Sequence, residues 1–170
     1  MKQFFVFSFL FFITFYSFSQ QRKEPYPFIT VGPDLLIPNA EFAETHNIGL
    51  GFTVSGGYKL NKHFAPVLSY NYYSVPTKNK LINSSLTAHL LKAGGRFYLD
   101  NFYLVTDAGA IFTSGYDNAT RFIYSVGAGD EIRLGKRSRL DISGAYEGFN
   151  TGRTTGIIAV RVGYTYRFFR

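Results

Sequence analysis

The sequence predicts an all-β fold, an eight-stranded antiparallel up-and-down transmembrane β-barrel preceded by a cleavable signal peptide. The chain opens with a short basic start and a long apolar run, as secretory signals do. Apolar and small polar side chains then alternate through eight segments, which is the period of a strand with two different faces. Short and long connections alternate between those segments, which is the usual topology of a membrane barrel.

Residues 1–19 have the features of a secretory signal peptide. A positive start precedes an almost wholly apolar run that contains eight phenylalanines, and Ser17 and Ser19 are the small residues before the cut. An anchoring helix is the alternative, but about 15 apolar residues are few for the ~20 that a spanning helix needs. We therefore predict cleavage after Ser19. Residues 20–27, which are polar and broken by two prolines, are predicted to form a periplasmic leader.

The composition excludes several classes of protein. The chain has no cysteine, so disulfides, a thiolate metal site and a lipid anchor at the cut are not expected. The formal net charge of +7 would suit an anionic partner, but an exported chain without basic runs is not expected to bind nucleic acid. Aromatic residues make up 19% of the chain and the mean hydropathy is −0.02, which fits a sheet with one face in lipid.

The first two strands are predicted on either side of a polar loop at residues 38–45. The first covers residues 28–37 and is interrupted by Gly32 and Pro33. Because proline lacks the N–H that a strand ladder needs, a bulge or a poorly paired position is expected there. The second covers residues 46–60, and its other face holds glycines and small hydroxyls that suit a crowded interior. Its outward side chains are Ile48, Leu50, Phe52, Val54, Tyr58 and Leu60.

The third and fourth strands are predicted at residues 64–75 and 84–99, separated by a basic loop at 76–83. The fourth strand changes phase, because its first apolar residues have one parity and its later ones the other. A bulge near Leu90-Leu91 is predicted to reconcile the two halves, and it directs Lys92 and Arg96 inward. The two sets are Leu86, Ala88 and Leu90, then Leu91, Ala93, Phe97 and Leu99.

The last four strands complete the count of eight. Asp100-Asn101 is a tight turn signal before the fifth. Closing eight strands pairs every backbone group, as lipid demands, and leaves an interior that side chains just fill. The predicted strands are 102–112, 121–135, 139–149 and 158–168, separated by a loop at 113–120, a turn at 136–138 and a loop at 150–155.

Charged side chains gather at the inward positions of the predicted barrel. Five basic and four acidic groups nearly balance there, and buried charges need partners. We therefore predict an ion-pair network that plugs the lumen, with a gated ion path as the alternative. The predicted members are Lys92, Arg96, Asp107, Glu131, Arg133, Asp141, Glu147, Arg161 and Arg167.

Asp130 breaks the pattern, because its parity places a carboxylate on the face that should contact lipid. Such a position is unfavourable, although less so than it is for Lys or Arg. A bulge within the stretch Gly127-Ala128-Gly129 would turn Asp130 inward. We favour this bulge over the alternative, in which Asp130 contacts a partner protein.

No set of residues predicts a catalytic or metal site. His89 lies near Ser84, Ser85 and Thr87, and His46 lies at the outer end of the second strand. No acid is placed to orient either histidine as a catalytic triad requires. The three histidines of the chain are too scattered for metal-ligand spacing. We therefore predict a non-enzymatic protein that carries no cofactor.

The last strand carries a pattern that resembles the C-terminal recognition signal of bacterial outer-membrane β-barrels. Arg161, Gly163, Tyr166 and Phe168 occupy its specified positions, with the departure that two residues follow the final aromatic. Together with the alternating strands, this pattern makes residues 28–170 similar to small eight-stranded outer-membrane barrels of the OmpA/OmpX kind. The resemblance is closest to the outer membrane protein β-barrel domain, or PorT-like, proteins of Bacteroidota.

This resemblance implies a place in the outer membrane of a Gram-negative cell and partners that belong there. The expected partners are outer-membrane lipid, lipopolysaccharide and, during insertion, the barrel-assembly machinery. Similarity to PorT-like proteins further implies an accessory role in an envelope or secretion machine, with a protein partner. A fold-level resemblance by itself implies little about activity.

We therefore predict a non-enzymatic integral outer-membrane barrel with a plugged lumen and extracellular loops that are available for binding. A secreted, soluble, lipocalin-like barrel is the alternative, in which the aromatic face would line a cavity for an apolar ligand. The low charge of the Gly/Ser/Thr face speaks against that alternative, because this face would then meet water. A small ion channel and a lipid A-modifying enzyme are less favoured.

Overall fold

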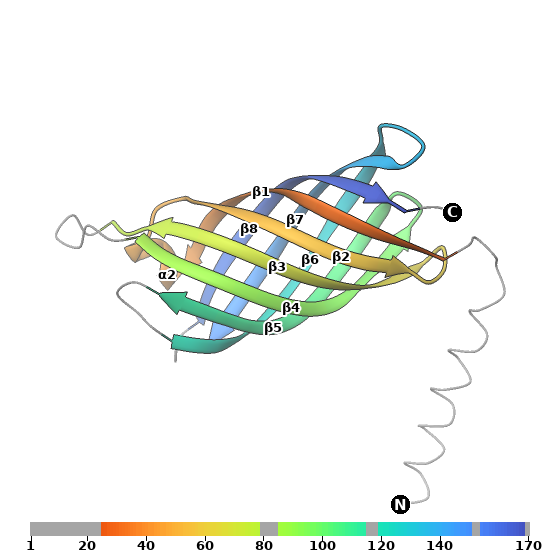
Figure 1. Ribbon diagram of the computed structural model, residues 1–170. Coiled ribbons are helices and arrows are strands. Elements are labelled where there is room, and N and C mark those ends of the chain that lie inside the picture. The colour runs from red at the N-terminus through yellow and green to blue at the C-terminus, as the bar shows by residue number, and fades with distance from the viewer. Residues whose placement is uncertain (1–24, 79–84, 115–118, 151–153, 169–170) are drawn as a thin grey trace, which may run out of the picture.

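The computed structural model describes residues 25–78, 85–114, 119–150 and 154–168. The predicted signal peptide, residues 1–19, lies outside the described residues, as do residues 20–24 of the leader and the last two residues. Eight antiparallel strands pair in sequence order, and the last closes against the first (Figure 1). The elements are β1 (Tyr26–Ala40), α2 (Glu41–Thr45), β2 (Gly49–Lys59), β3 (Phe64–Pro76), β4 (Ser85–Leu99), β5 (Phe102–Ser114), β6 (Ala119–Arg133), β7 (Ser138–Asn150) and β8 (Thr154–Arg167).

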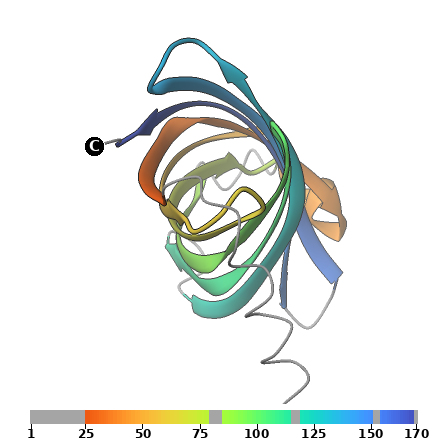
Figure 2. The same cartoon turned by 90° about the vertical axis from the view of Figure 1, so that its right-hand side faces the viewer.

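The two ends of the barrel differ, as Figures 1 and 2 show. At one end lie the tight β2–β3, β4–β5 and β6–β7 turns together with the start of β1 and the end of β8. At the other end lie α2, the ends of β3, β5 and β7, and the starts of β4, β6 and β8. Short turns are periplasmic in outer-membrane barrels, so we refer to the first end as the periplasmic end and to the second as the extracellular end.

β1 is longer than predicted at both ends. It begins at Tyr26 instead of residue 28 and continues to Ala40, and α2 takes up the rest of the predicted 38–45 loop. On the β8 side the pairing steps from Val31 to Asp34 without a change of register. Gly32 and Pro33 are therefore poorly paired and do not form a bulge. Poor pairing was one of the two outcomes predicted for this position.

The apolar face of each strand points away from the lumen. Leu50 is 69% exposed and Phe122 is 62% exposed, and such large apolar side chains follow one another around the outside of the barrel. Lipid is the environment that accepts this surface, because the closed sheet leaves no unpaired edge. The lipocalin-like alternative, in which this face would line a cavity, is therefore wrong.

The predicted bulge in β4 is absent. The pairing of β4 with β3 runs without interruption from Phe64↔Phe97 to Pro76↔Ser85. Leu86, Ala88 and Leu90 consequently point into the lumen on the same face as Lys92 and Arg96, and Leu90 is fully buried. The change of phase in the sequence marks the point where the inner face of β4 becomes apolar. The predicted bulge is wrong because it rests on a lumen that is polar along its whole length.

The predicted bulge near Asp130 is also absent, and Asp130 is exposed on the outer face. The β5–β6 pairing continues through Gly127 and Gly129 to the pair Phe102↔Asp130. These glycines face inward, and a Cβ on Gly129 would lie 2.6 Å from the ring of Tyr103. Asp130 lies opposite the first residue of β5, close to the periplasmic rim, where an outward carboxylate is tolerated better than at mid-membrane.

The lumen contains two apolar layers, and its charged groups lie between the two layers and among the side chains of the periplasmic one. The layer at the periplasmic end consists of Tyr26, Phe28, Ala65, Tyr98 and Tyr103. The layer toward the extracellular end is larger and includes Phe42 of α2, which packs edge-on against Phe149 at 5.8 Å between ring centroids. Its members are Leu36, Phe42, Tyr73, Val75, Leu86, Ala88, Leu90, Ile111, Ile123, Phe149, Ile157 and Ala159.

Candidate functional site

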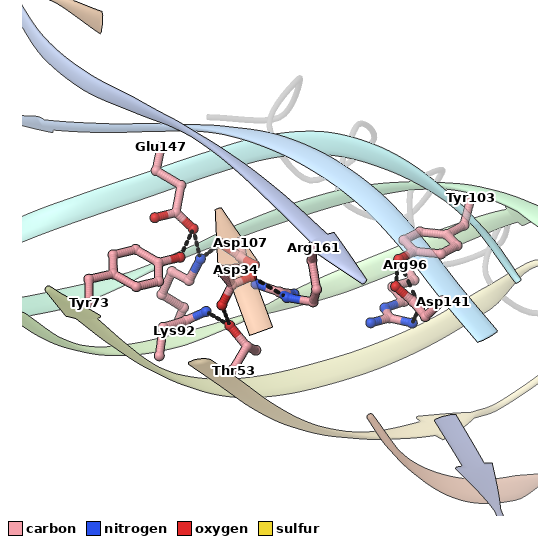
Figure 3. A network of polar contacts seen from close by, with 11 residues as sticks. Asp34, Thr53, Tyr73, Lys92, Arg96, Tyr103, Asp107, Asp141, Glu147 and Arg161 are labelled. Carbon is pink, nitrogen blue, oxygen red and sulfur yellow. Dashed lines mark hydrogen bonds and ion pairs between the residues drawn. The ribbon is translucent and has the colours of Figure 1, made fainter. Parts of the chain in front are cut away.

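Lys92 lies in the lumen, where side chains from several strands of the barrel approach one another (Figure 3). Its Nζ lies 2.5 Å from Oε1 of Glu147 and 3.5 Å from Oδ1 of Asp107. The hydroxyl of Tyr73 donates a hydrogen bond of 3.0 Å to the same Oε1 of Glu147. β3, β4, β5 and β7 are thus linked through one ammonium group and one carboxylate.

Asp34 joins this group from β1. Nε of Arg161 donates to Oδ1 of Asp34 at 2.7 Å, and the hydroxyl of Thr53 donates to Oδ2 at 2.5 Å. The amide of Asn71 in turn donates to the Thr53 hydroxyl. We call Asp34, Lys92, Asp107, Glu147 and Arg161 the mid-lumen cluster.

A second group lies nearer the periplasmic end and is centred on Arg96. Nη1 of Arg96 lies 2.9 Å from Oδ2 of Asp141 and 3.5 Å from Oε1 of Glu131. The hydroxyl of Tyr103 lies 2.9 Å and 3.0 Å from the two carboxylate oxygens of Asp141. Both oxygens of Asp141 are therefore acceptors for donors that are themselves buried.

Glu131 links this second group to β8. The hydroxyl of Tyr98 donates to Oε1 of Glu131 at 2.8 Å, and Arg167 pairs with Oε2. The Arg167 guanidinium also lies over the ring of Tyr26, with 5.2 Å from Cζ to the ring centroid. We call Arg96, Glu131, Asp141 and Arg167 the lower-lumen cluster.

The two clusters differ in charge. The lower-lumen cluster has two carboxylates and two guanidinium groups, so its formal charge is zero. The mid-lumen cluster has three carboxylates against one ammonium and one guanidinium, so its formal charge is −1. Buried charges are stable only when they are paired and hydrogen-bonded, and the mid-lumen cluster meets this condition less completely.

A small cavity lies beside the mid-lumen cluster. Its volume is about 30 Å³ and its wall includes Lys92, Asp107, Ser125, Ser143 and Glu147. Oε2 of Glu147 and Oδ1 of Asp107 have no hydrogen-bond partner among the residues that the structure describes. A polar cavity of this size has room for about two water molecules, which suits these two acceptors.

The structure brings together eight of the nine charged residues that were predicted to face the lumen, and it leaves out Arg133. Arg133 is the last residue of β6 and is exposed, with its Nε 3.4 Å from the carbonyl of Gly135. Its parity is that of Glu131, but the β6–β7 hairpin carries it beyond the lumen. Its assignment to the plugging network is corrected accordingly.

Sequence reasoning missed Asp34 and the buried tyrosines. Asp34 shares the parity of Thr30, and both are buried, but the interruption at Gly32-Pro33 concealed this alternation. Tyr73, Tyr98 and Tyr103 were overlooked because aromatic residues were assigned to lipid. The signal for Tyr73 was its position between the outward residues Tyr72 and Ser74, because the residue between two outward positions of a strand faces inward.

Three residues of the predicted assembly signal lie on β8, and the fourth, Phe168, follows its last residue. Arg161 faces the mid-lumen, and Gly163 is buried where β8 approaches β1, with a Cβ at that position 3.1 Å from the methyl of Thr30. The rings of Tyr166 and Phe168 pack edge-to-face at 5.0 Å. Their recognition by assembly machinery stays a prediction.

His89 and its neighbours lie on the outer face of the barrel. Nδ1 of His89 is 2.7 Å from the hydroxyl of Tyr70, and its ring lies edge-on to Tyr72. Thr87 shares this face, whereas Ser84 lies outside the described residues. His89 thus contacts aromatic side chains. The parts of the chain described here hold no group of three or more residues suited to a metal ion.

His46 lies at the extracellular end, next to α2. Its ring stacks on Phe42 at 3.9 Å between centroids, and its Nδ1 lies 2.8 Å from the hydroxyl of Thr45. Burial lowers the pKa of His46, and a hydrogen bond to the Phe42 backbone opposes that effect in part. These contacts are those of a packing residue that holds α2 against the barrel.

Known proteins match this architecture. The model of the outer membrane protein beta-barrel domain family matches residues 6–168. The chain belongs to this family. Its place is therefore the bacterial outer membrane, and the prediction of an eight-stranded outer-membrane barrel is confirmed. Among the described residues no helix is long and apolar enough to cross a membrane. No curated protein matches the chain.

Solved structures of small outer-membrane barrels have the same fold. The attachment invasion locus protein Ail of Yersinia pestis is 16% identical, with 85% of this chain and 99% of that chain covered and a TM-score of 0.61. Neisserial surface protein A is 12% identical, with coverage of 86% and 100% and a TM-score of 0.68. OprG of Pseudomonas aeruginosa is 12% identical, with coverage of 89% and 99% and a TM-score of 0.60. At these identities the likeness concerns the fold alone.

Proposed function

We propose that this protein is a non-enzymatic, sealed barrel that holds a binding surface at the outer face of the outer membrane. The observation that carries this proposal is the filled lumen. Each of the eight strands contributes a side chain to the polar network or to a hydrogen bond with it, as the partners of Lys92, Arg96, Asp34, Glu131 and Glu147 show.

The polar network opposes opening because its members are buried and paired across the lumen. Arg96 and Lys92 are each 3% exposed, and Asp141 is fully buried. Removing one partner of such a pair costs about 3–5 kcal/mol, since the other charge is left without compensation. Ions moving through the lumen would have to break several of these pairs at once.

The apolar layer above the network is a second barrier. Leu36, Leu90, Ile111 and Ile123 are each no more than 2% exposed. They lie between the mid-lumen cluster and the extracellular end, where a hydrated ion would find no polar partner. An ion would thus meet a charged plug and then an apolar one.

The surroundings of His89 favour a role in packing over one in catalysis. A histidine acts as a general base when a third group orients it and a nucleophile lies within reach. The hydrogen-bond partner of His89 is the Tyr70 hydroxyl on an apolar outer face, which is the composition of an aromatic belt at a membrane interface.

The extracellular end offers an ordered surface for binding. α2 presents Glu41 and Glu44, and the segment after β3 holds the helix in place. Nζ of Lys78 donates to the carbonyl of Ala43 at 2.5 Å, and the Lys78 amide donates to the carbonyl of Thr45 at 2.8 Å. At this location the surface would contact lipopolysaccharide and envelope proteins, which are therefore its expected partners.

Single-channel recording in planar bilayers tests the sealed lumen. We expect the purified native protein to show no stable open level. The matched control is the double variant Lys92→Ala/Arg96→Ala, which removes the two central cations and should produce conductance if it refolds. Stable discrete open levels of the native protein would contradict the sealed lumen and favour the ion path.

Thiol labelling tests which end carries the outer surface. The chain has no cysteine, so a variant such as Glu44→Cys introduces a single thiol at α2. A membrane-impermeant maleimide should label Glu44→Cys on intact cells and label Lys62→Cys, in the β2–β3 turn, only after lysis. The reverse pattern would contradict the proposed orientation.

A further inference from the structure

The β6–β7 hairpin stands clear of the other turns at the periplasmic end, as Figures 1 and 2 show. Between Asp130 and the turn its outer face is apolar, with Ile132 47% and Leu134 59% exposed. Its inner face is basic, because Arg133 and Arg139 are directly opposed in the β6–β7 pairing. Like charges in directly opposed positions destabilise a strand pair, so this arrangement needs a compensating group.

Arg167 adds a third positive charge at the same place. Arg139 lies opposite Thr165 of β8, and it interacts electrostatically with Arg167, Arg133, Glu131 and Tyr26. Arg133 of β6 and Arg167 of β8 therefore both lie near Arg139 of β7 at the periplasmic rim. We call Arg133, Arg139 and Arg167 the rim arginines.

The described residues do not supply enough negative charge to balance the rim arginines. Glu131 and Asp141 are directly opposed in the β6–β7 pairing and are the lumen carboxylates at this level. The oxygens of Glu131 are already engaged with Arg167, Arg96 and the Tyr98 hydroxyl, and those of Asp141 with Arg96 and the Tyr103 hydroxyl. The ion pairs of the described residues include neither Arg133 nor Arg139. Nε of Arg139 is buried and has no hydrogen-bond partner in the described part of the chain.

We propose that the rim arginines form a binding site for an oxyanion of the phosphate class. The planar guanidinium offers parallel N–H donors that match two oxygens of a phosphate group. A phosphate between β6 and β8 relieves the repulsion of Arg133 and Arg139 and gives the Arg139 Nε–H an acceptor. This site is separate from the extracellular surface of the proposed function, and it depends only on the folded barrel.

Two sources supply this chemistry at the periplasmic rim. Free phosphate and soluble phosphate esters reach the rim from the periplasm. The headgroup of an anionic phospholipid reaches it from the inner leaflet, which the apolar outer side of the same hairpin contacts. The experiment has one arm for each source.

The test uses the full barrel refolded in maltoside micelles, which contain no phosphate. Proton–nitrogen NMR spectra of the arginine Nε–Hε groups are recorded while sodium phosphate is added, and again with sodium chloride at equal ionic strength. We expect a saturable shift of the Arg139 resonance with phosphate and no such shift with chloride. In the second arm, phosphatidylglycerol is added to the micelles in phosphate-free buffer.

A saturable shift in the first arm identifies a soluble phosphate site, and a shift in the second arm alone identifies a headgroup site. Equal small shifts with phosphate and chloride, together with no response to phosphatidylglycerol, would overturn the proposal. Calorimetry with whichever probe binds should then show about a tenfold weaker affinity for Arg139→Gln. Lys62→Gln, which removes one charge from a different periplasmic turn, should leave the affinity within about twofold.

Arg133→Gln keeps the proposal testable if Arg139→Gln does not refold. Arg133 is exposed at the end of β6, so its replacement does not disturb the lumen. This variant should also weaken binding of the probe, and an unchanged affinity would contradict a site shared by the rim arginines. Heat-modifiable migration on gels confirms that each variant is folded before it is titrated.

Discussion

The mid-lumen and lower-lumen clusters lie one above the other in the same barrel, yet their hydrogen bonds differ. In the lower-lumen cluster both oxygens of Asp141 accept from Arg96 and Tyr103. In the mid-lumen cluster Oε1 of Glu147 accepts from Lys92 and Tyr73, while Oε2 has no partner among the described residues and Glu147 lines the cavity. The charges of the lumen nearly balance in total, but the two clusters differ. The lower-lumen cluster is neutral, whereas the mid-lumen cluster has one carboxylate more than it has cations.

This comparison teaches that the number of charges in a lumen is a poor guide to what each one contributes. A buried carboxylate with two occupied oxygens is fixed by its partners, and its loss leaves donors unsatisfied. A carboxylate with one free oxygen beside a polar cavity can be changed with little loss. The two clusters thus give opposite expectations for chemically similar substitutions.

Lys92→Met should have the largest effect on stability. It leaves Asp34, Asp107 and Glu147 with Arg161 as the remaining cation of the cluster, so the formal charge falls from −1 to −2. We expect a loss of about 4 kcal/mol in the free energy of unfolding, measured by urea titration of the refolded barrel. A loss below about 1 kcal/mol would show that Lys92 is not the centre of the mid-lumen cluster.

Asp141→Asn should have the next largest effect. The Arg96 charge loses its nearest carboxylate, which lies at 2.9 Å. If the new NH₂ group faces Arg96 a donor meets a donor, and if it faces Tyr103 that hydroxyl must change from donor to acceptor. We expect a loss of about 3 kcal/mol in the free energy of unfolding. The measurement is the temperature at which the barrel loses its compact mobility on gels, which should be lower for the variant. Migration unchanged from that of the native chain would argue against a complete lower-lumen cluster.

Asp130→Asn provides the matched control outside the lumen. Asp130 is exposed on the outer face, and the same change from carboxylate to amide there removes a charge from the edge of the lipid. We expect a change of less than about 1 kcal/mol, in the direction of greater stability. Substantial destabilisation would contradict this account, because it would show that the Asp130 carboxylate makes a stabilising contact within the barrel itself.

His46 should give the smallest effect, and it depends on pH. Because burial lowers the pKa of His46 below the ordinary value of 6.5, the unfolded state binds its proton first as the pH falls. The packing of α2 is therefore fully stable above pH 6.5 and weakens as the pH falls toward the lowered value. The chemical shifts of the His46 and Phe42 rings should follow this change, while the signals of both lumen clusters stay constant.

Much of the fold could be predicted because lipid imposes a simple rule on the outer face. The outward residues alternate regularly from Ile48 to Leu60, with Gly56 as a single gap, and from Phe102 to Phe112, with Thr106 as a single gap. The strands and faces of β2 and β5 were therefore clear. The same reasoning failed where the inner face is also apolar, as at Leu86, Ala88 and Leu90. Alternation identifies two faces, but it does not say which one is inside when both are hydrophobic.

The candidate site could be predicted as a set of residues and not as two clusters. Parity placed eight of the nine charged residues in the lumen, because strands alternate strictly. Which of them pair depends on the register and stagger of strands far apart in sequence, such as β4 with β7. The position of Arg133 beyond the lumen likewise depends on how far the β6–β7 hairpin projects, which alternation does not encode.

Glu147→Gln tests the difference between the clusters most directly, when its urea titration is run beside that of Asp141→Asn. The amide keeps Oε1 as the acceptor for Lys92 and Tyr73 and places NH₂ on the cavity side, while the formal charge of the mid-lumen cluster goes from −1 to zero. We predict that Glu147→Gln changes the free energy of unfolding by less than about 1 kcal/mol, against about 3 kcal/mol for Asp141→Asn. Equal losses in the two variants would contradict the account.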